Sequence, residues 1–133
     1  MNHRRFVLAS IDGVPLPAVE HETVSGRYVA LADTIVFVSS TRGFHTRVVR
    51  VEPTIAQPVE TVRSTTEFTY ELTESTPASS PPVGSISLTY VCGIGTLADC
   101  LQGPHLSGVL HEATLNMHVL HQSPERERRY VRR

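Results

Sequence analysis

Apolar and polar residues alternate along most of this chain, which is the pattern of β-strands. In residues 62–73, large apolar side chains alternate with charged and hydroxyl-bearing ones from Phe68 onward. Residues 85–92 repeat the alternation with Ile86, Leu88 and Tyr90 on one side. Each segment therefore has one apolar face and one face turned to water.

Other segments of the chain predict further strands. They are 6–11, 27–38 (one long strand or two short ones broken near Asp33), 44–52, 106–111, 113–120 and 126–132. The alternation slips at Val48-Val49, which indicates a bulge or a stretch buried on both faces. Residues 14–17 contain two prolines and are expected to cross in an extended, polyproline-like form.

Turn-forming residues separate these strands. Asp12-Gly13, residues 39–43, Glu112 and residues 122–124 predict turns. The proline-rich stretch 74–84 predicts a loop, since proline blocks both helix and sheet pairing. A second loop is expected at 53–58.

About eight sequential strands with no helix-length spacer predict an antiparallel meander. A meander of this size buries its inner face most economically by closing on itself, which also removes exposed edges. We therefore predict a single domain, 1–133, that forms an all-β, up-and-down barrel of about eight strands. A β-sandwich is the alternative, although the chain lacks the core Trp and widely spaced Cys typical of immunoglobulin-like sandwiches.

The apolar positions of the predicted strands give a set of inward-facing candidates. They are Phe6, Leu8, Tyr28, Ile35, Phe37, Phe44, Phe68, Tyr70, Leu72, Ile86, Leu88, Tyr90, Leu115 and Met117. Because these side chains are large for a chain of 133 residues, we expect a largely filled interior.

Charge and composition exclude several classes of protein. Twelve basic against 13 acidic residues give a net charge of −1, which argues against a nucleic-acid binder. Apolar runs such as 35–38 are far shorter than the roughly 20 residues of a membrane helix. No export signal precedes the first strand, so a cytoplasmic location is expected, or a periplasmic one if a signal was cleaved. Cys92 and Cys100 fit either a local disulfide or two free thiols.

All twelve basic residues are arginine, and five of them gather at the C-terminus. The planar guanidinium suits bidentate pairing with carboxylates or anionic head groups at an interface. The candidate partner-binding residues are Arg126, Arg128, Arg129, Tyr130, Arg132 and Arg133.

No spacing of reactive residues predicts catalysis, a cofactor or a metal. His111, His118 and His121 do not converge on one strand face. In residues 91–95, Cys92 is followed by Gly93 and Gly95, but the segment lacks the context of a nucleophile elbow. Glu67 and Glu71 share a strand face, yet that face is the wet one. We expect no catalytic, cofactor-binding or metal-binding residues.

Several short segments resemble small bacterial lipocalin-like proteins. FVLASIDGVPLP (6–17) is similar to their opening strand, TYEL (69–72) and GSISLTY (84–90) to two middle strands, GVLHEATLNM (108–117) to a hairpin, and RYVRR (129–133) to the closing strand. The resemblance implies a barrel but no established activity. The chain has no Trp, so the ligand pocket of lipocalins with a Gly-x-Trp motif does not carry over.

These observations together predict a non-catalytic interaction or structural protein. We expect an accessory subunit with protein partners in a larger assembly, such as a membrane-bound energy-transducing complex, with peripheral contact to a membrane protein and no membrane span. The alternative is a lipocalin-like protein that binds a small apolar ligand inside the barrel.

Overall fold

The computed structural model describes residues 3–54, 57–74, 83–91, 104–120 and 126–133. Within these residues no long apolar helix of the kind that spans a bilayer is present. Their ordered elements are all strands: β1 (Arg4–Ile11), β2 (Val14–Pro15), β3 (Ala18–Thr23), β4 (Gly26–Phe37), β5 (Arg42–Pro53), β6 (Glu60–Glu74), β7 (Val83–Tyr90), β8 (Leu106–His111), β9 (Thr114–Val119) and β10 (Glu127–Arg132).

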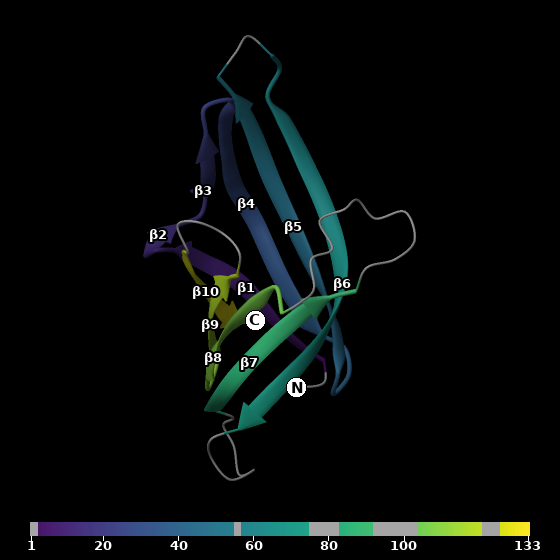
Figure 1. Ribbon diagram of the computed structural model, residues 1–133. Helices are drawn as coiled ribbons and strands as arrows, with labels where there is room; N and C mark the ends of the chain where they lie inside the picture. The colour runs from purple at the N-terminus through teal and green to yellow at the C-terminus, as the bar shows by residue number, and fades with distance from the viewer. Residues whose placement is uncertain (1–2, 55–56, 75–82, 92–103, 121–125) are drawn as a thin grey trace.

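The strands form one antiparallel sheet that closes on itself (Figure 1). Its order is β2-β1-β10-β9-β8-β7-β6-β5-β4-β3, and an additional pairing of β1 with β4 completes the ring. β1 and β4 to β10 therefore make an eight-stranded barrel in which neighbours are sequential except at β1. The prediction of an all-β, up-and-down barrel is confirmed.

β2 and β3 are the two strands that the sequence did not predict. Asp12 and Gly13 have φ values of 49° and 82°, which suit a two-residue hairpin turn, and Ile11 pairs with Val14 across it. β2 is very short because the prolines around it limit pairing. β3 follows directly and pairs with the first half of β4.

Four strands continue beyond the barrel as an extension (Figure 1). The pairing of β1 with β4 is limited to the last part of β4, residues 34–37. The pairing of β7 with β6 is limited to residues 68–74 of β6. We use "the extension" for β3 together with residues 26–32 of β4, 48–53 of β5 and 60–66 of β6.

The irregularity predicted at Val48-Val49 lies in the partner strand. Ala30 pairs with Val49 and Ala32 with Val48, so Leu31 is an extra residue in β4 opposite them. This bulge marks where the barrel passes into the extension, since bulges bend and twist a strand locally.

The predicted loops are shorter than expected where the structure describes them. Val83 and Gly84 belong to β7, Glu74 to β6 and Pro53 to β5, because each pairs with a neighbouring strand. The turn at Glu112 is confirmed by its φ of 56° between β8 and β9. The rest of the proline-rich loop, residues 122–124 and both cysteines lie outside the described residues.

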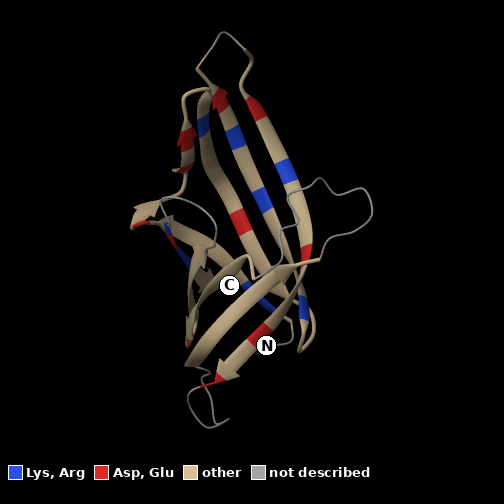
Figure 2. Cartoon of the chain, viewed as in Figure 1, with Lys and Arg blue, Asp and Glu red and all other residues tan. Residues whose placement is uncertain are grey.

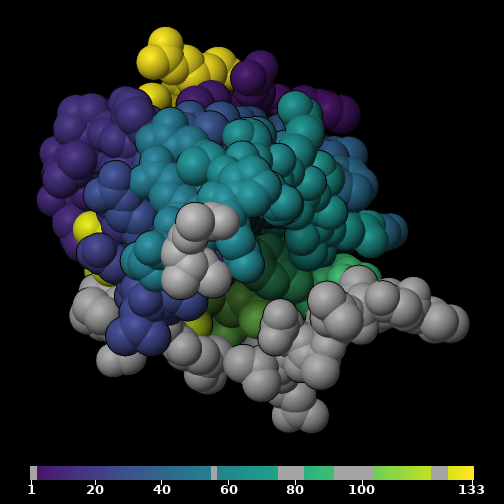
Figure 3. Space-filling view, turned by 90° about the horizontal axis from the view of Figure 1, so that it is seen from above, coloured from purple at the N-terminus to yellow at the C-terminus, as the bar shows by residue number. Residues whose placement is uncertain are grey.

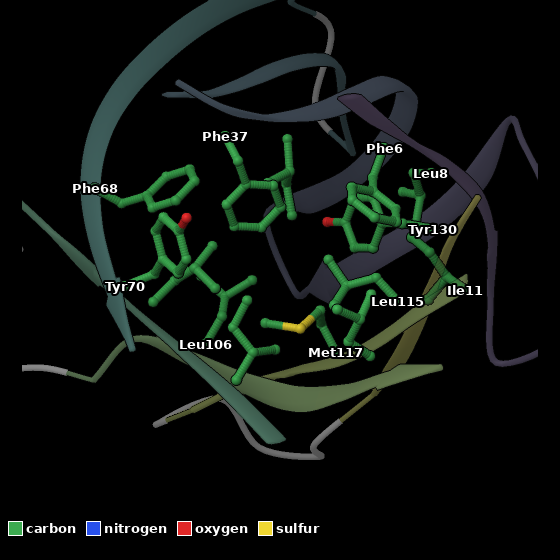
Figure 4. Close-up of a cluster of buried hydrophobic side chains, with 14 of the residues drawn as sticks. Phe6, Leu8, Ile11, Phe37, Phe68, Tyr70, Leu106, Leu115, Met117 and Tyr130 are labelled. Carbon is green, nitrogen blue, oxygen red and sulfur yellow. The ribbon is translucent and has the colours of Figure 1, made fainter. Parts of the chain in front are cut away.

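The barrel interior holds one apolar core (Figure 4). Phe37 contacts Phe6, Phe68 and Tyr70 with ring centroids 5.8, 5.5 and 4.7 Å apart. Of the predicted inward residues, ten are buried: Phe6, Leu8, Ile35, Phe37, Phe68, Tyr70, Ile86, Leu88, Leu115 and Met117. Leu72 and Tyr90 are partly buried against them. The core also contains Ile11, Leu106, Leu110 and Tyr130.

Two predicted core residues are wrong. Phe44 is 42% exposed and Tyr28 is 36% exposed. In β5, Gly43 and His45 face inward. The packing at Gly43 is close, since a Cβ there would lie 2.4 Å from the ring of Phe68. Tyr28 lies in the extension, beyond the part of β4 that closes the barrel.

The N-terminal and C-terminal strands lie side by side, as the adjacent purple and yellow surfaces show (Figure 3). Phe6 pairs with Arg132, and the backbone N–H of Arg133 donates to the carbonyl of Arg5 at 3.0 Å. The start of β1 and the end of β10 thus meet at the barrel end where β4 turns into β5.

Truncation of a core residue should separate the two faces of the barrel wall. Leu88 is fully buried, so Leu88→Ala should lower the free energy of unfolding by about 2–5 kcal/mol through lost transfer energy and a cavity. Thr69→Ala, on the exposed outer face of β6, should change it by less than about 0.5 kcal/mol. Urea denaturation followed by circular dichroism measures both; similar losses would mean that the inward and outward faces are misassigned.

Candidate functional site

Ionisable side chains occupy the end of the barrel interior that adjoins the extension. Glu20, Asp33, His45 and Arg128 are buried, and the Arg47 side chain is 33% exposed. We call these five residues the charged layer. Figure 2 shows charged residues at matching heights on β4 and β5, where the barrel meets the extension.

Strand alternation places these residues inside. Asp33 lies two residues before Ile35 and four before Phe37, which are core residues on the same face of β4. Asp33 pairs with Arg47 across β4 and β5. On β10, Arg128 pairs with the core residue Met117 of β9. The charges therefore continue the apolar face and do not interrupt it.

Arg128 joins the two buried carboxylates. Its Nη1 donates to Asp33 Oδ2 and its Nη2 donates to Glu20 Oε2, both at 3.2 Å. Arg47 Nη2 donates to Glu20 Oε1, and Arg47 Nε lies 3.8 Å from Asp33 Oδ2. Two carboxylates thus face two guanidiniums.

His45 connects the carboxylates to a row of aromatic rings. Its Nε2 donates to Asp33 Oδ1 at 2.5 Å, and its Nδ1 is hydrogen-bonded to the Tyr90 hydroxyl at 2.9 Å. Ring centroids are 4.9 Å apart for His105 and Tyr90, 6.0 Å for Tyr90 and His45, and 6.4 Å for His45 and Tyr130. The row crosses the barrel from β7 to β10.

The layer fixes the protonation of its members. Burial raises the pKa of Asp33, but His45 and then Arg128 and Arg47 outweigh it, so this pKa lies below its usual value. Burial raises the pKa of Tyr90 to about 12 and that of Tyr130 well above its usual value. At neutral pH, Asp33 is therefore ionised while both tyrosines keep their protons.

Three buried nitrogen atoms at this end have no hydrogen-bond partner among the described residues. They are Arg128 Nε, Arg47 Nε and His105 Nε2. Tyr130 is fully buried, Figure 4 shows its hydroxyl directed toward the middle of the barrel, and an interaction with the Asp33 carboxylate contributes to its raised pKa. Because a buried unsatisfied polar group costs about 1–3 kcal/mol, the three nitrogens lower the stability of this end of the barrel.

The structure divides the predicted partner-binding residues into three groups. Arg129, Arg132 and Arg133 are exposed. Arg128 and Tyr130 point into the barrel, so the surface role predicted for them is corrected: strand alternation turns these two positions of β10 inward. Arg126 pairs with Asp12 at 2.8 Å and donates to the carbonyl of Val19, which fastens β10 to the β1–β2 turn.

The other residues considered in the sequence lie outside this layer. Among the described residues, no group of three or more His, Cys, Asp or Glu is placed to hold a metal ion. Glu67 forms an ion pair with Arg42. Glu71 and His118 line an open groove of about 340 Å³ on the outer face of β6 to β9. His121 lies outside the described residues.

The charged layer itself was missed from the sequence. The available signal was strand parity: Asp33 shares a face with Ile35 and Phe37, and His45 follows Gly43 by two positions. An ionisable residue on an otherwise inward face points to an interior site. Glu20 had no such signal, because β3 was not predicted.

Replacing the central carboxylate should destabilise the protein strongly. Asp33→Asn leaves Glu20 as the one carboxylate of the layer that faces the guanidiniums of Arg128 and Arg47. One positive charge at a buried position then lacks a counter-charge, so the free energy of unfolding should fall by about 3–5 kcal/mol at pH 7. Asp12→Asn removes the exposed pair with Arg126 and should cost about 1 kcal/mol or less. Denaturant titration compares the two variants; equal losses would contradict the central role of Asp33.

The effect of Asp33→Asn should also depend on pH. The folded-state pKa of Asp33 is lowered, whereas an unfolded aspartate titrates near about 3.9. The stability contributed by Asp33 is therefore complete above that pH and is lost as pH falls through the folded-state pKa. The difference between wild type and Asp33→Asn should shrink toward low pH, and a difference that grew there would contradict the assignment.

Comparison with known proteins leaves the function to be argued from this geometry. No protein-family model, curated protein or solved structure matches the chain.

Proposed function

We propose that this protein is a non-catalytic binding protein that takes a small ligand at the end of the barrel where the charged layer meets the extension. The observation that carries the proposal is the position of the charged layer, whose one partly exposed member, Arg47, adjoins an exposed apolar row on the extension.

An apolar row on the extension supports this placement. Arg47, Val49 and Val51 alternate along β5 and so share one face. Val62 pairs with Val49, and Tyr28 pairs with Val51. Val62 and Tyr28 are exposed, and the two β5 valines are half-buried. The row leads outward from the charged layer, so a ligand with a polar head and an apolar body fits both.

The contacts of His45 favour binding over catalysis. A general base needs a ring nitrogen that can reach the substrate. Both nitrogens of His45 are engaged, one by Asp33 and one by Tyr90. The carboxylates of Glu20 and Asp33 are likewise held by arginines. This pairing supports a preorganised recognition surface.

Placing a charge on the apolar row should weaken ligand binding. N-phenyl-1-naphthylamine, a neutral apolar fluorescent probe, should bind wild-type protein with increased emission. Val62→Asp should lower its affinity at least about tenfold, since desolvating a carboxylate opposes apolar contact. Val109→Asp is the matched control, because Val109 is 50% exposed against 47% for Val62 and lies on the outer face of β8. Failure of the probe to bind, or equal affinity in both variants, would contradict the proposal.

A second candidate function is docking to an acidic partner through the opposite end of the barrel. The observation that favours it is the pairing of β1 with β10, which gathers Arg4, Arg5, Arg132 and Arg133 at one end. None of the four forms an ion pair with another described residue. This basic end retains the accessory-subunit hypothesis, with exposed arginines as contacts for a partner's carboxylates.

Removing charge from the basic end should weaken binding to an acidic chain. The double variant Arg132→Ser/Arg133→Ser should bind polyglutamate about fivefold more weakly than wild type, and added salt should weaken wild-type binding as screening increases. Arg27→Ser/Arg63→Ser removes two charges from the extension and serves as the control. Fluorescence anisotropy with labelled polyglutamate measures all three proteins; equal affinities would exclude the basic end as the contact.

A further inference from the structure

We infer that the outer edge of β6 in the extension is an interaction surface, and that its partner is a second copy of this chain, joined to it by antiparallel strand pairing. This inference goes beyond the proposed ligand-binding function and does not rest on it.

The part of β6 that lies in the extension has one open edge. Residues 60–66 pair with β5 on one side. On the other side, β7 pairs with residues 68–74, and the Val91 N–H that follows β7 donates to the Glu67 carbonyl at 2.8 Å. Within the described chain, no strand pairs with the outer side of 60–66, which borders the extension (Figure 1). Such an edge can pair with a further strand.

Strand geometry identifies the backbone groups on this edge. The N–H and C=O of one residue point to the same side of a strand, and that side alternates along the chain. The Glu67 carbonyl points toward β7, since it accepts the N–H of Val91. Thr61, Arg63 and Thr65 have the same parity as Glu67. Their N–H and C=O groups therefore point out of the open edge.

The opposite edge of the extension, formed by β3, is protected against pairing. β3 has a register shift between Val19 and His21, and the intervening Glu20 is a buried charge. Arg126 donates to the carbonyl of Val19. Bulges and inward-pointing charges are devices that keep sheet edges from pairing. The pairing of β5 with β6 runs through the extension without a register shift, so the β6 edge is regular.

Two-fold symmetry restricts the register of a β6–β6 pair. Residues opposite each other in an antiparallel pair point to the same face of the sheet, so a symmetric pair has one residue opposite itself. A centre at Arg63 or Glu60 would place like charges directly opposite each other, which is destabilising. A centre at Ser64 would require the backbone of Glu67, whose carbonyl already accepts from Val91.

A centre at Val62 meets these constraints. Val62 then lies opposite Val62 of the second copy. Thr61 exchanges both backbone hydrogen bonds with Arg63 of the second copy, because both residues present their backbone groups at the open edge. Glu60 lies opposite Ser64, so this register opposes no like charges.

The same register buries apolar surface. Val62 is 47% exposed and pairs with Val49 of β5. Opposite a second Val62 it would lose much of this exposure, and the apolar rows of the two copies would become continuous. A centre at Thr61 would instead place Val62 opposite the carboxylate of Glu60, which would be partly desolvated. Apolar burial and backbone pairing therefore favour the same register.

Two substitutions at Arg63 test the edge. Sedimentation velocity of the wild-type protein should show a monomer–dimer equilibrium in the micromolar range. Arg63→Pro removes an outward N–H at a position where an edge strand tolerates proline, and it should raise the dimer dissociation constant at least about tenfold. Arg63→Ala removes the charge but keeps the N–H, and it should change this constant less than about threefold. Circular dichroism checks that both variants fold.

Charges placed at exposed threonines test the register. Thr61→Glu puts a carboxylate opposite Arg63 of the second copy and should tighten dimerisation about threefold. Thr65→Glu is the matched control, because Thr65 lies equally far from Arg63 along its own strand but opposite Val59 of the second copy. It should leave the dissociation constant unchanged. Thr61→Arg should weaken dimerisation about threefold, which gives a second test of the pair if Arg63→Pro does not fold.

Each outcome bears on the inference. Wild-type protein that stayed monomeric throughout the micromolar range would overturn it, as would equal dissociation constants for Arg63→Pro and Arg63→Ala. Equal effects of Thr61→Glu and Thr65→Glu would overturn the register centred on Val62. A dimer that is weakened by Arg63→Pro and tightened by Thr61→Glu, with both controls near wild type, would support the paired edge.

Discussion

The rest of this structure depends on the compensation of one buried carboxylate. Asp33 lies inside a barrel, where an unpaired charge would be prohibitively costly. His45 of β5 and Arg128 of β10 both hydrogen-bond the Asp33 carboxylate, and Arg128 also donates to Glu20 of β3. Four strands must therefore be in correct register for the charges to meet, since a slip of one residue turns every side chain to the opposite face. The charged layer thus specifies the alignment of strands far apart in the sequence.

The barrel interior is divided into two parts with different properties. Around Phe37, aromatic rings from several strands pack edge to face and leave a filled core. Beyond it, the charged layer keeps donors without acceptors at the base of an exposed apolar row. A rigid apolar floor holds those donors in place, which would lower the cost of ordering them in the proposed binding site. The division separates the filled core from the end of the barrel at which we propose that a ligand binds.

The barrel was predictable because strand alternation is a local property, clearest at Phe68, Tyr70, Leu88 and Met117. β3 was not predictable, since Pro15 and Pro17 resemble a crossing segment and its pairing depends on β4. Phe44 misled because hydrophobicity suggested that it faces inward, whereas Gly43 and His45 take that side; only the ring of Phe68 and the carboxylate of Asp33 explain why. The charged layer depends on contacts between residues far apart in sequence. Strand parity marks Asp33 and His45 as inward-facing, but neither composition nor spacing shows which residues meet them there.

The Arg128 contacts also bear on how the chain folds. Arg128 lies 95 positions from Asp33 and 108 from Glu20, and β10 is the last barrel strand to be synthesised. Until β10 docks, neither carboxylate has the Arg128 guanidinium as a partner. Closure of the barrel and completion of the charged layer are therefore coupled, and together they must overcome the loop entropy of nearly the whole chain. Barrel closure is in this sense a charge-neutralisation step as much as a hydrophobic one.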